Sequence, residues 1–218
     1  TSVTSPKLRE RDPYNRLFTR GPRFRLSAET IRDNGLAISG LLCSDRGGPP
    51  VFPPQPAGLW RQTGRNEPKY VVAKDQDRFR RGVYVVWRRA APYPSFVLFD
   101  GPDRAACHPR RSRTNTPLQA LALLNDEAYV EMALAFADRV LRERPDDDLS
   151  ARVTHAFRLA LARAPAPEEQ RHLERVARRE LKRLRAAPVE ARRIVNGVRG
   201  FKPDKDVDKV ELASWWFV

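Results

Sequence analysis

Residues 107–126 read C-H-P-R-R-S-R-T-N-T-P-L-Q-A-L-A-L-L-N-D, and the character of the chain changes at this stretch. Thr116 is a suitable helix N-cap, and Pro117 fits the first helical position, where its missing N–H needs no partner. Three leucines follow at near-helical spacing, at Leu118, Leu121 and Leu124. Before this stretch the chain is rich in proline, glycine and aromatic residues, whereas after it apolar residues recur with helical periodicity. The sequence therefore predicts a mainly α, irregular helical domain.

Further helices are expected where capping residues precede apolar residues at helical spacing. They cover residues 27–42, 127–144, 149–163, 167–185 and 188–198, and a last one begins at Asp206 or Asp208. Gly35 interrupts the apolar stripe of the first of these helices, which predicts the close approach of another helix. We expect the helices from Pro117 onward to pack as antiparallel pairs on helix 27–42.

The part before residue 107 contains a long Pro/Gly-rich loop at residues 44–68, through which no helix can run. Three short apolar runs follow, at residues 70–72, 83–87 and 96–99. Their β-branched and aromatic residues favour a few short strands. A helix from Asp77 to Arg89 is the alternative for the middle run, although Gly82 and three valines weaken it.

Length and composition bound the domain organisation. The 218 residues fit a single domain, and 41% apolar with 31% charged residues indicates a globular chain. We divide residues 1–218 into a linker-like segment (1–13), a part with one helix and many loops (14–109) and a helical part (110–218). The chain starts with Thr1 rather than an initiator methionine, so we expect it to be a fragment.

The chain is strongly basic, with a formal net charge of +14, and only seven of its 41 basic residues are lysine. Clustered arginine favours a polyanion partner, because binding releases counterions from the polymer. The alternative is a general compositional bias that enriches arginine, alanine and proline together, without a binding role. The densest basic run, at residues 178–185, is accordingly either a basic patch or the solvated face of a helix.

The basic run before Pro117 is a candidate anion site, because free N–H groups and the helix dipole attract anions at a helix start. Its residues are Arg110, Arg111, Arg113, Asn115 and Thr116. In the alternative, the arginines pair with Asp33, Asp100 or Asp103 and serve the architecture only.

Two further candidates involve polar and aromatic side chains. Arg32, Asp33 and Gln119 would form a polar pocket with the basic run if the protein were an enzyme. Trp60 follows the proline-rich loop, and an exposed tryptophan stacks on sugars or bases. The alternative is that Trp60 anchors this loop to the core.

The spacing of cysteine and histidine predicts no metal site. Cys43 and Cys107 match no zinc or haem spacing, and the sequence leaves open whether they form a disulfide or stay unpaired. The three histidines, His108, His155 and His172, lie far apart in the sequence. The chain contains no apolar run long enough for a membrane span.

Residues 110–126, R-R-S-R-T-N-T-P-L-Q-A-L-A-L-L-N-D, resemble the signature of the planctomycete PSD domain, a family of unknown function. The N-T-P-L-Q-A-L run is specific, and the likeness covers roughly residues 10–217. Similar segments are D-P-Y-N-R-L (12–17), G-P-R-F-R-L (21–26), A-E-T-I-R-D (28–33), Q-P-A-G-L-W (55–60), residues 80–89 and F-D-G-P (99–102). One departure is Ala166, where a Ser, Thr or Asp cap is expected before Pro167.

The resemblance implies a C-terminal domain of a large exported protein with a planctomycete-type cytochrome c domain upstream. It implies no known reaction and no agreed catalytic residue, and it places the start of this chain inside the domain. It also favours the helix at residues 77–89. We therefore expect no cofactor in this chain, haem c on an upstream domain, and a periplasmic or cell-surface location.

The function expected from these observations is a non-catalytic structural or binding module of an exported, haem-bearing, multidomain protein. Its expected partners are the upstream domains of the same polypeptide and an anionic polysaccharide. One alternative is part of an enzyme whose active site is completed by upstream residues. A second is a nucleic-acid-binding domain, which would need a continuous basic face across several helices.

Overall fold

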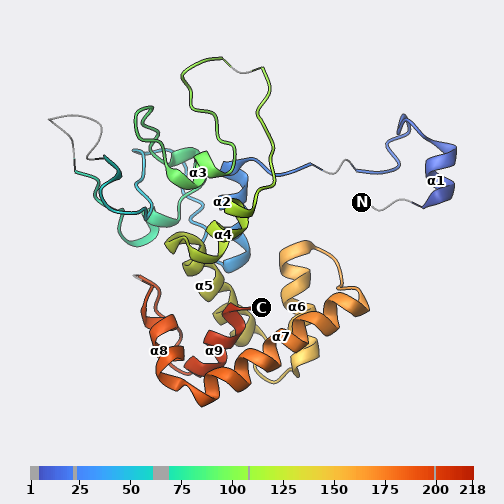
Figure 1. Cartoon of the computed structure of the whole chain (residues 1–218), viewed down its shortest axis with the longest axis vertical. Helices are drawn as coiled ribbons and strands as arrows, with labels where there is room; N and C mark the ends of the chain where they lie inside the picture. The colour runs from blue at the N-terminus through green and yellow to red at the C-terminus, as the bar shows by residue number, and fades with distance from the viewer. Residues whose placement is uncertain (1–4, 22–23, 61–68, 108, 199) are drawn as a thin grey trace.

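The computed structural model describes residues 5–21, 24–60, 69–107, 109–198 and 200–218 (Figure 1). In these ranges it contains helices and no strand, and its β pairing consists of isolated bridges between Cys43 and Arg80 and between Val51 and Val85. The α-helices are α1 (Pro6–Arg11), α2 (Ala28–Ser39), α3 (Pro94–Leu98), α4 (Pro117–Asn125), α5 (Glu127–Glu143), α6 (Leu149–Leu161), α7 (Pro167–Ala186), α8 (Pro188–Asn196) and α9 (Lys209–Trp216). The predicted mainly α class is confirmed.

Capping residues determine where most of these helices begin. Thr116 and Gln119 form a reciprocal capping box at the start of α4. Asp126, Asp148 and Asp208 each accept a backbone hydrogen bond at the starts of α5, α6 and α9. The helical part of the chain therefore follows the predicted boundaries to within a few residues.

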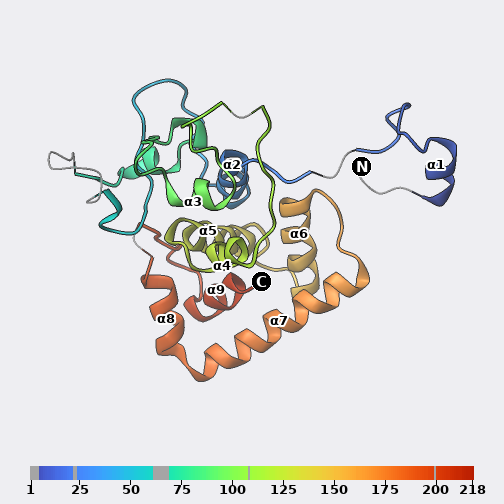
Figure 2. The same ribbon diagram turned by 45° about the horizontal axis from the view of Figure 1, so that its top comes forward.

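Helices α5 to α9 pack around one apolar cluster. We call this part of the molecule the helical half. In Figure 2, α7 runs across the bottom of the molecule, with α6 and α8 at its ends and α9 between α7 and α5. The fully buried side chains of this cluster include Leu134, Val140, Leu184 and Leu212. Of the helices from Pro117 onward, α5 packs on α2 as expected, whereas α9 packs against α5, α7 and α8. The expectation that these helices all pack as pairs on helix 27–42 is therefore wrong.

The loop-rich half lies on the other side of α5 (Figure 1). Its core includes Leu36 of α2, Phe96 of α3 and Val51 of the proline-rich loop. Gly35 makes room for a side chain of α5, since a Cβ there would lie 2.7 Å from the Met132 sulfur. The predicted close helix contact is confirmed, and α5 contributes side chains to both clusters.

Residues 75–89 form neither the continuous helix favoured by the resemblance nor strands. They form two short 3-10 helices, η2 (Asp75–Phe79) and η3 (Gly82–Tyr84). Arg80 breaks the segment: its buried guanidinium donates to the carbonyls of Gly47 and Pro49 and lies 4.1 Å from the Tyr84 ring centre. Contacts with a distant loop therefore override the local preference.

The apolar run at residues 96–99 is also not a strand. Pro94 occupies the first turn of α3, where its fixed backbone angle favours a helix. Phe96 and Phe99 both belong to the core of the loop-rich half, so their side chains are buried as the apolar pattern required.

The segment expected to be linker-like contains α1, and residues 5–21 stand apart from the rest of the molecule (Figure 1). Asp12 is 5% exposed, and its carboxylate accepts from the backbone N–H groups of Arg16 and Leu17 at 2.8 and 3.0 Å. Arg20 donates to the Asp12 carbonyl at 2.7 Å. The segment is therefore held by its own local bonds.

Two further expectations concern cysteines and membranes. Cys43 is buried and Cys107 is exposed, and they form no disulfide. Among the described residues, no helix combines the length and the apolar character needed to cross a bilayer.

Candidate functional site

The arginines predicted to bind an anion mostly contact other groups of the chain. Arg111 forms an ion pair with Glu29 in the first turn of α2, at 2.8 Å between Nη1 and Oε2. The guanidinium of Arg113 lies 5.3 Å from the centre of the Phe24 ring. Arg110 is exposed. The acidic partner of Arg111 is thus Glu29, not one of the three aspartates considered from the sequence.

Hydrogen bonds around Gln119 join the start of α4 to the preceding loop. Gln119 is 1% exposed, and its Nε2 donates to the Leu98 carbonyl at 2.9 Å and to the Thr114 hydroxyl at 3.0 Å. Its Oε1 accepts from the Thr116 N–H at 3.2 Å. Asn115 accepts from Arg25 at 2.9 Å. These polar groups satisfy one another, as an architectural role requires.

Asp100 is a partner in this network that sequence reasoning did not select as a functional residue. Its carboxylate accepts from the Thr114 N–H at 2.7 Å and from the Thr114 hydroxyl. Its backbone has φ of 62°, and Gly101 follows it. The F-D-G-P segment indicated a turn at Asp100, but no local signal pointed to Thr114, fourteen residues away, as its partner.

The polar pocket expected from Arg32, Asp33 and Gln119 is divided between two sets of bonds. Asp33 accepts from Arg81 at 2.9 Å and from the Gly82 N–H at 2.5 Å. Arg32 is 2% exposed and donates to the Arg78 carbonyl at 2.7 Å. Both residues therefore hold residues 78–82, whereas Gln119 holds residues 98–116.

A buried charge cluster lies where α2, η2 and α5 meet. Glu131 is 2% exposed, and its Oε2 lies 2.7 Å from Arg78 Nη2. Burial raises the pKa of Glu131 to about 7, although Arg78 and Arg32 oppose this change. The cluster is closely packed, and its neighbours are Arg32, Leu36, Pro54, Arg78, Phe79, Ala128, Glu131 and Met132. Glu131 was not selected from the sequence, and α5 buries a second acid, Asp138, on the same side.

Trp60 lies in a ring cluster and is 8% exposed. Its ring packs edge-on against Tyr70 at 5.0 Å and Phe52 at 5.9 Å between centres, and the Arg88 guanidinium lies 4.9 Å from it. This position fits the loop-anchoring alternative. Residues 61–68 of the same loop lie outside the described residues.

Histidine and acidic side chains provide no candidate metal centre in the described ranges, where no three His, Cys, Asp or Glu side chains converge. His155 lies 2.7 Å from Glu143 on the helical half. His108 lies outside the described residues.

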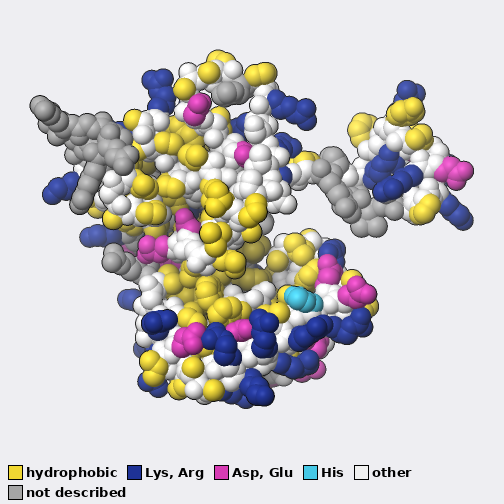
Figure 3. Space-filling view, in the orientation of Figure 1, with side chains coloured by type: hydrophobic (Ala, Val, Ile, Leu, Met, Phe, Trp, Pro, Cys, Tyr) yellow, Lys and Arg dark blue, Asp and Glu magenta, His cyan; other side chains and the backbone are white. Residues whose placement is uncertain are grey.

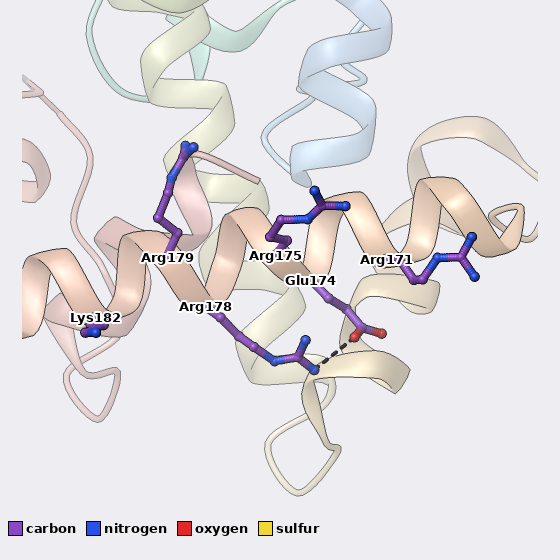
Figure 4. A pocket seen from close by; sticks show the side chains of 6 residues that line it. All are labelled: Arg171, Glu174, Arg175, Arg178, Arg179 and Lys182. Carbon is purple, nitrogen blue, oxygen red and sulfur yellow. Dashed lines mark hydrogen bonds and ion pairs between the residues drawn. The ribbon is translucent and has the colours of Figure 1, made fainter.

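A basic surface hollow follows the outer face of α7 (Figure 4). Its volume is about 530 Å³, and it is lined by Arg171, Glu174, Arg175, Arg178, Arg179 and Lys182. These positions lie opposite Ala177 and Leu184, which are buried under the helix. Figure 3 shows the Lys and Arg side chains of this region gathered along the lower edge of the molecule. We call this surface the α7 groove.

The charge of the α7 groove is only partly neutralised. Its one acid, Glu174, accepts from Arg178 and from Gln170, both at 2.9 Å, and these bonds hold the Glu174 pKa below its usual range. Arg171, Arg175 and Lys182 form no ion pair within the described part of the chain. The groove can therefore offer three cationic side chains to a ligand.

Comparison with known proteins identifies a family but no characterised relative. No curated protein and no solved structure matches the chain. A family model described as "PSD1: Protein of unknown function (DUF1553)" matches residues 1–177, which confirms the resemblance carried by the N-T-P-L-Q-A-L run. The match extends from the first residue through α6 and into α7, so the chain belongs to the PSD1 family of proteins of unknown function.

Proposed function

We propose that this domain is a non-catalytic module that binds an anionic polysaccharide through the α7 groove. The observation that carries the proposal is the set of three cations, Arg171, Arg175 and Lys182, without an acidic partner in the described structure. Surface arginines elsewhere are often engaged, as Arg111 is with Glu29. In the α7 groove the three cations lie together on the outer face of a single helix (Figure 4).

The spacing of these cations suits a linear polymer. Arg171, Arg175, Arg178 and Lys182 recur every three or four residues, so they lie along one side of the helix. With a rise of about 1.5 Å per residue, the array extends over about 16 Å. Several sulfate or carboxylate groups of one chain can contact it together, and each contact releases counterions.

The composition of the α7 groove favours a polysaccharide over a nucleic acid. Its six lining residues come from one helix and include no aromatic side chain on which a base could stack. A nucleic-acid surface is expected to extend over several elements and to combine basic with base-reading side chains. Sulfated or uronic polysaccharides need only regularly spaced cations.

We propose a setting for the domain as well, which is supported by the resemblance of residues 110–126 to the planctomycete PSD signature. We place the domain outside the cytoplasm, at the cell surface or in the periplasm, attached to upstream domains of which one carries haem c. The saturated hydrogen bonds around Gln119 support a structural role for the α4 region rather than a catalytic one.

The test uses two triple variants that each remove two arginines and one lysine. The first changes Arg171, Arg175 and Lys182 to alanine, and the matched control changes Lys7, Arg9 and Arg11 on the exposed helix α1. Fluorescence anisotropy measures binding to labelled heparin, as the sulfated polysaccharide, and to labelled double-stranded DNA over a salt series. Circular dichroism checks that both variants fold.

We expect the α7 variant to lose at least about tenfold in heparin affinity and to reduce the salt slope by two to three, since each phosphate-like contact contributes about one. The control should change affinity less than about twofold. Equal losses of affinity in both variants would mean that binding depends on net charge alone, and would refute the α7 groove as the binding site. Tighter binding to DNA than to heparin, lost in the α7 variant, would favour the nucleic-acid alternative instead.

A further inference from the structure

Helix α4 turns its apolar side chains away from the protein. Its one buried residue is the polar Gln119, which holds the preceding loop. The exposed fractions are 63% for Leu118, 55% for Leu121 and 64% for Leu124, and Leu123 is 43% exposed. A surface helix normally buries such a stripe, so the orientation of α4 is inverted.

These leucines form one continuous apolar edge, which we call the α4 leucine edge. Leu118, Leu121 and Leu124 recur every third residue, and the nine residues of α4 include no charged side chain. Figure 3 shows hydrophobic side chains gathered over α4 in the middle of this face of the molecule. Contiguous exposed apolar surface of this kind marks interaction sites.

We propose that the α4 leucine edge binds the same edge of a second copy of this chain, with the two helices antiparallel. A two-fold axis through Leu121 would place it against its own counterpart and Leu118 of each copy against Leu124 of the other. The stripe is symmetric about Leu121 in both spacing and residue type. It is therefore self-complementary, as an isologous interface requires.

Charges at the two ends of α4 match this arrangement. The exposed Arg110 and Arg113 precede the helix, and the exposed Glu127 follows it. In an antiparallel pair, the basic end of each α4 lies beside the acidic end of the other. The dipoles of the two helices point in opposite directions, so the positive end of each helix lies beside the negative end of the other. A parallel pair would instead bring like charges together at both ends, which disfavours that orientation.

The expected association is weak. The exposed edge of a nine-residue helix offers a small contact area, whereas stable complexes bury about 1,200 to 2,000 Å². We therefore expect a reversible dimer that forms at tens to hundreds of micromolar, on the order of 10–500 μM.

The experiment is sedimentation equilibrium of the whole chain, with Leu121→Asp as the test and Leu161→Asp as the control. Both leucines are 55% exposed in the structure, and Leu161 lies at the end of α6. Because Leu121 faces itself in the proposed dimer, its replacement brings two carboxylates together. We expect Leu121→Asp to be monomeric throughout and Leu161→Asp to associate like the unchanged chain.

A charge exchange tests the antiparallel orientation. Glu127→Arg should weaken the dimer at least about fivefold, and adding Arg113→Glu should restore it, because the two positions would meet across the interface. The proposal is refuted if the unchanged chain stays monomeric up to about 1 mM, or if the two Leu→Asp variants behave alike. An unrestored double variant refutes the antiparallel pairing. None of these residues belongs to the α7 groove, so failure here leaves the polysaccharide proposal intact.

Discussion

The two halves of this domain are stabilised in different ways. The helical half buries apolar faces of α5 to α9 in one cluster, and its ion pairs lie mostly at the surface. The loop-rich half combines a smaller core with arginine side chains that donate to distant backbone carbonyls, as Arg32 and Arg80 do. A helix satisfies its own backbone, whereas loops need side chains for that purpose. Backbone carbonyls are thus satisfied by helical hydrogen bonds in the helical half and partly by arginine side chains in the loop-rich half.

Arginine in the loop-rich half also covers aromatic rings. The guanidinium groups of Arg80, Arg88 and Arg104 lie 4.1, 4.9 and 4.6 Å from the ring centres of Tyr84, Trp60 and Trp87. Lysine offers neither the planar stacking surface nor the fork of donors. Part of the arginine excess therefore serves the fold, so net charge alone is a poor guide to a polyanion site.

The largest predicted effect concerns the cores of the two halves. Leu134→Ala in the helical half and Leu36→Ala in the loop-rich half each remove a leucine that is at most 1% exposed. Each should lower the free energy of unfolding by about 3 kcal/mol, since buried Leu→Ala typically costs 2–5. Urea denaturation followed by circular dichroism and by tryptophan fluorescence measures this change.

The two probes, circular dichroism and tryptophan fluorescence, together test whether the two halves unfold in one step. Trp60 and Trp87 report on the loop-rich half and Trp215 and Trp216 on the helical half. One coincident transition in both variants would mean that the halves unfold together. Separate transitions would mean that each half is stable alone. Leu161→Ala, at an exposed position, serves as the control and should change stability little.

Gln119→Ala should produce the next largest effect, about 2 kcal/mol. The substitution leaves the Leu98 carbonyl, the Thr114 hydroxyl and the Thr116 N–H without their partner. Chemical denaturation measures the loss, and limited proteolysis should show faster cleavage within residues 99–116. Leu118→Ala on the exposed edge of the same helix is the control. Equal effects of the two substitutions would contradict an architectural role for Gln119.

Glu131 should make the loop-rich half sensitive to pH. The folded protein retains a proton on this carboxyl up to a pKa of about 7, whereas the unfolded chain loses it near 4.5. The resulting stabilisation is complete below the lower value and is lost as pH rises toward the upper one. The unfolding free energy should therefore fall by about 2 kcal/mol between about pH 5 and pH 7, relative to Glu131→Gln. Parallel pH profiles of the two proteins would show that Glu131 stays ionised.

Ala166→Ser should give the smallest effect, a gain of about 0.5–1 kcal/mol. Helix α7 begins without a side-chain cap, although Glu169 accepts from the Ala166 N–H at 2.7 Å. A serine hydroxyl would supply the missing acceptor and complete the capping box. Thermal denaturation would show the gain as a higher Tm. Thr116→Ala, which removes the existing cap of α4, should lower the Tm by a similar amount.

The helices from Pro117 onward were largely predictable from the sequence because each of them carries its own signals. Thr116, Asp126 and Asp148 precede apolar periodicity, and α4, α5 and α6 begin directly after them. Periodicity does not say what covers an apolar face, however. The regular spacing of Leu118, Leu121 and Leu124 predicted the helix correctly and did not reveal that its apolar edge is exposed.

The loop-rich half and most of the candidate site depend on contacts that local sequence does not encode. Arg32 bonds to a carbonyl 46 residues away, and Arg111 pairs with Glu29 across 82 residues. Many aspartates were possible partners for each arginine, and only the three-dimensional path of the chain selects among them. The basic run at residues 178–185 was visible in the sequence, but it contains the ion-paired Arg178, Arg179 and Arg183. Which cations of α7 have no acidic partner could be recognised only from the positions of the neighbouring acids.

The double role of α5 has a consequence for hydrogen exchange. Tyr129 and Met132 near its start pack in one cluster, and Val140 and Leu141 near its end pack in the other. The central amides of α5 therefore stay protected while either cluster is intact, and they exchange only when the whole domain opens. Amides of α1 and of the exposed α4 exchange by local opening. The slowest amides of this chain should accordingly come from one helix and report a single opening free energy.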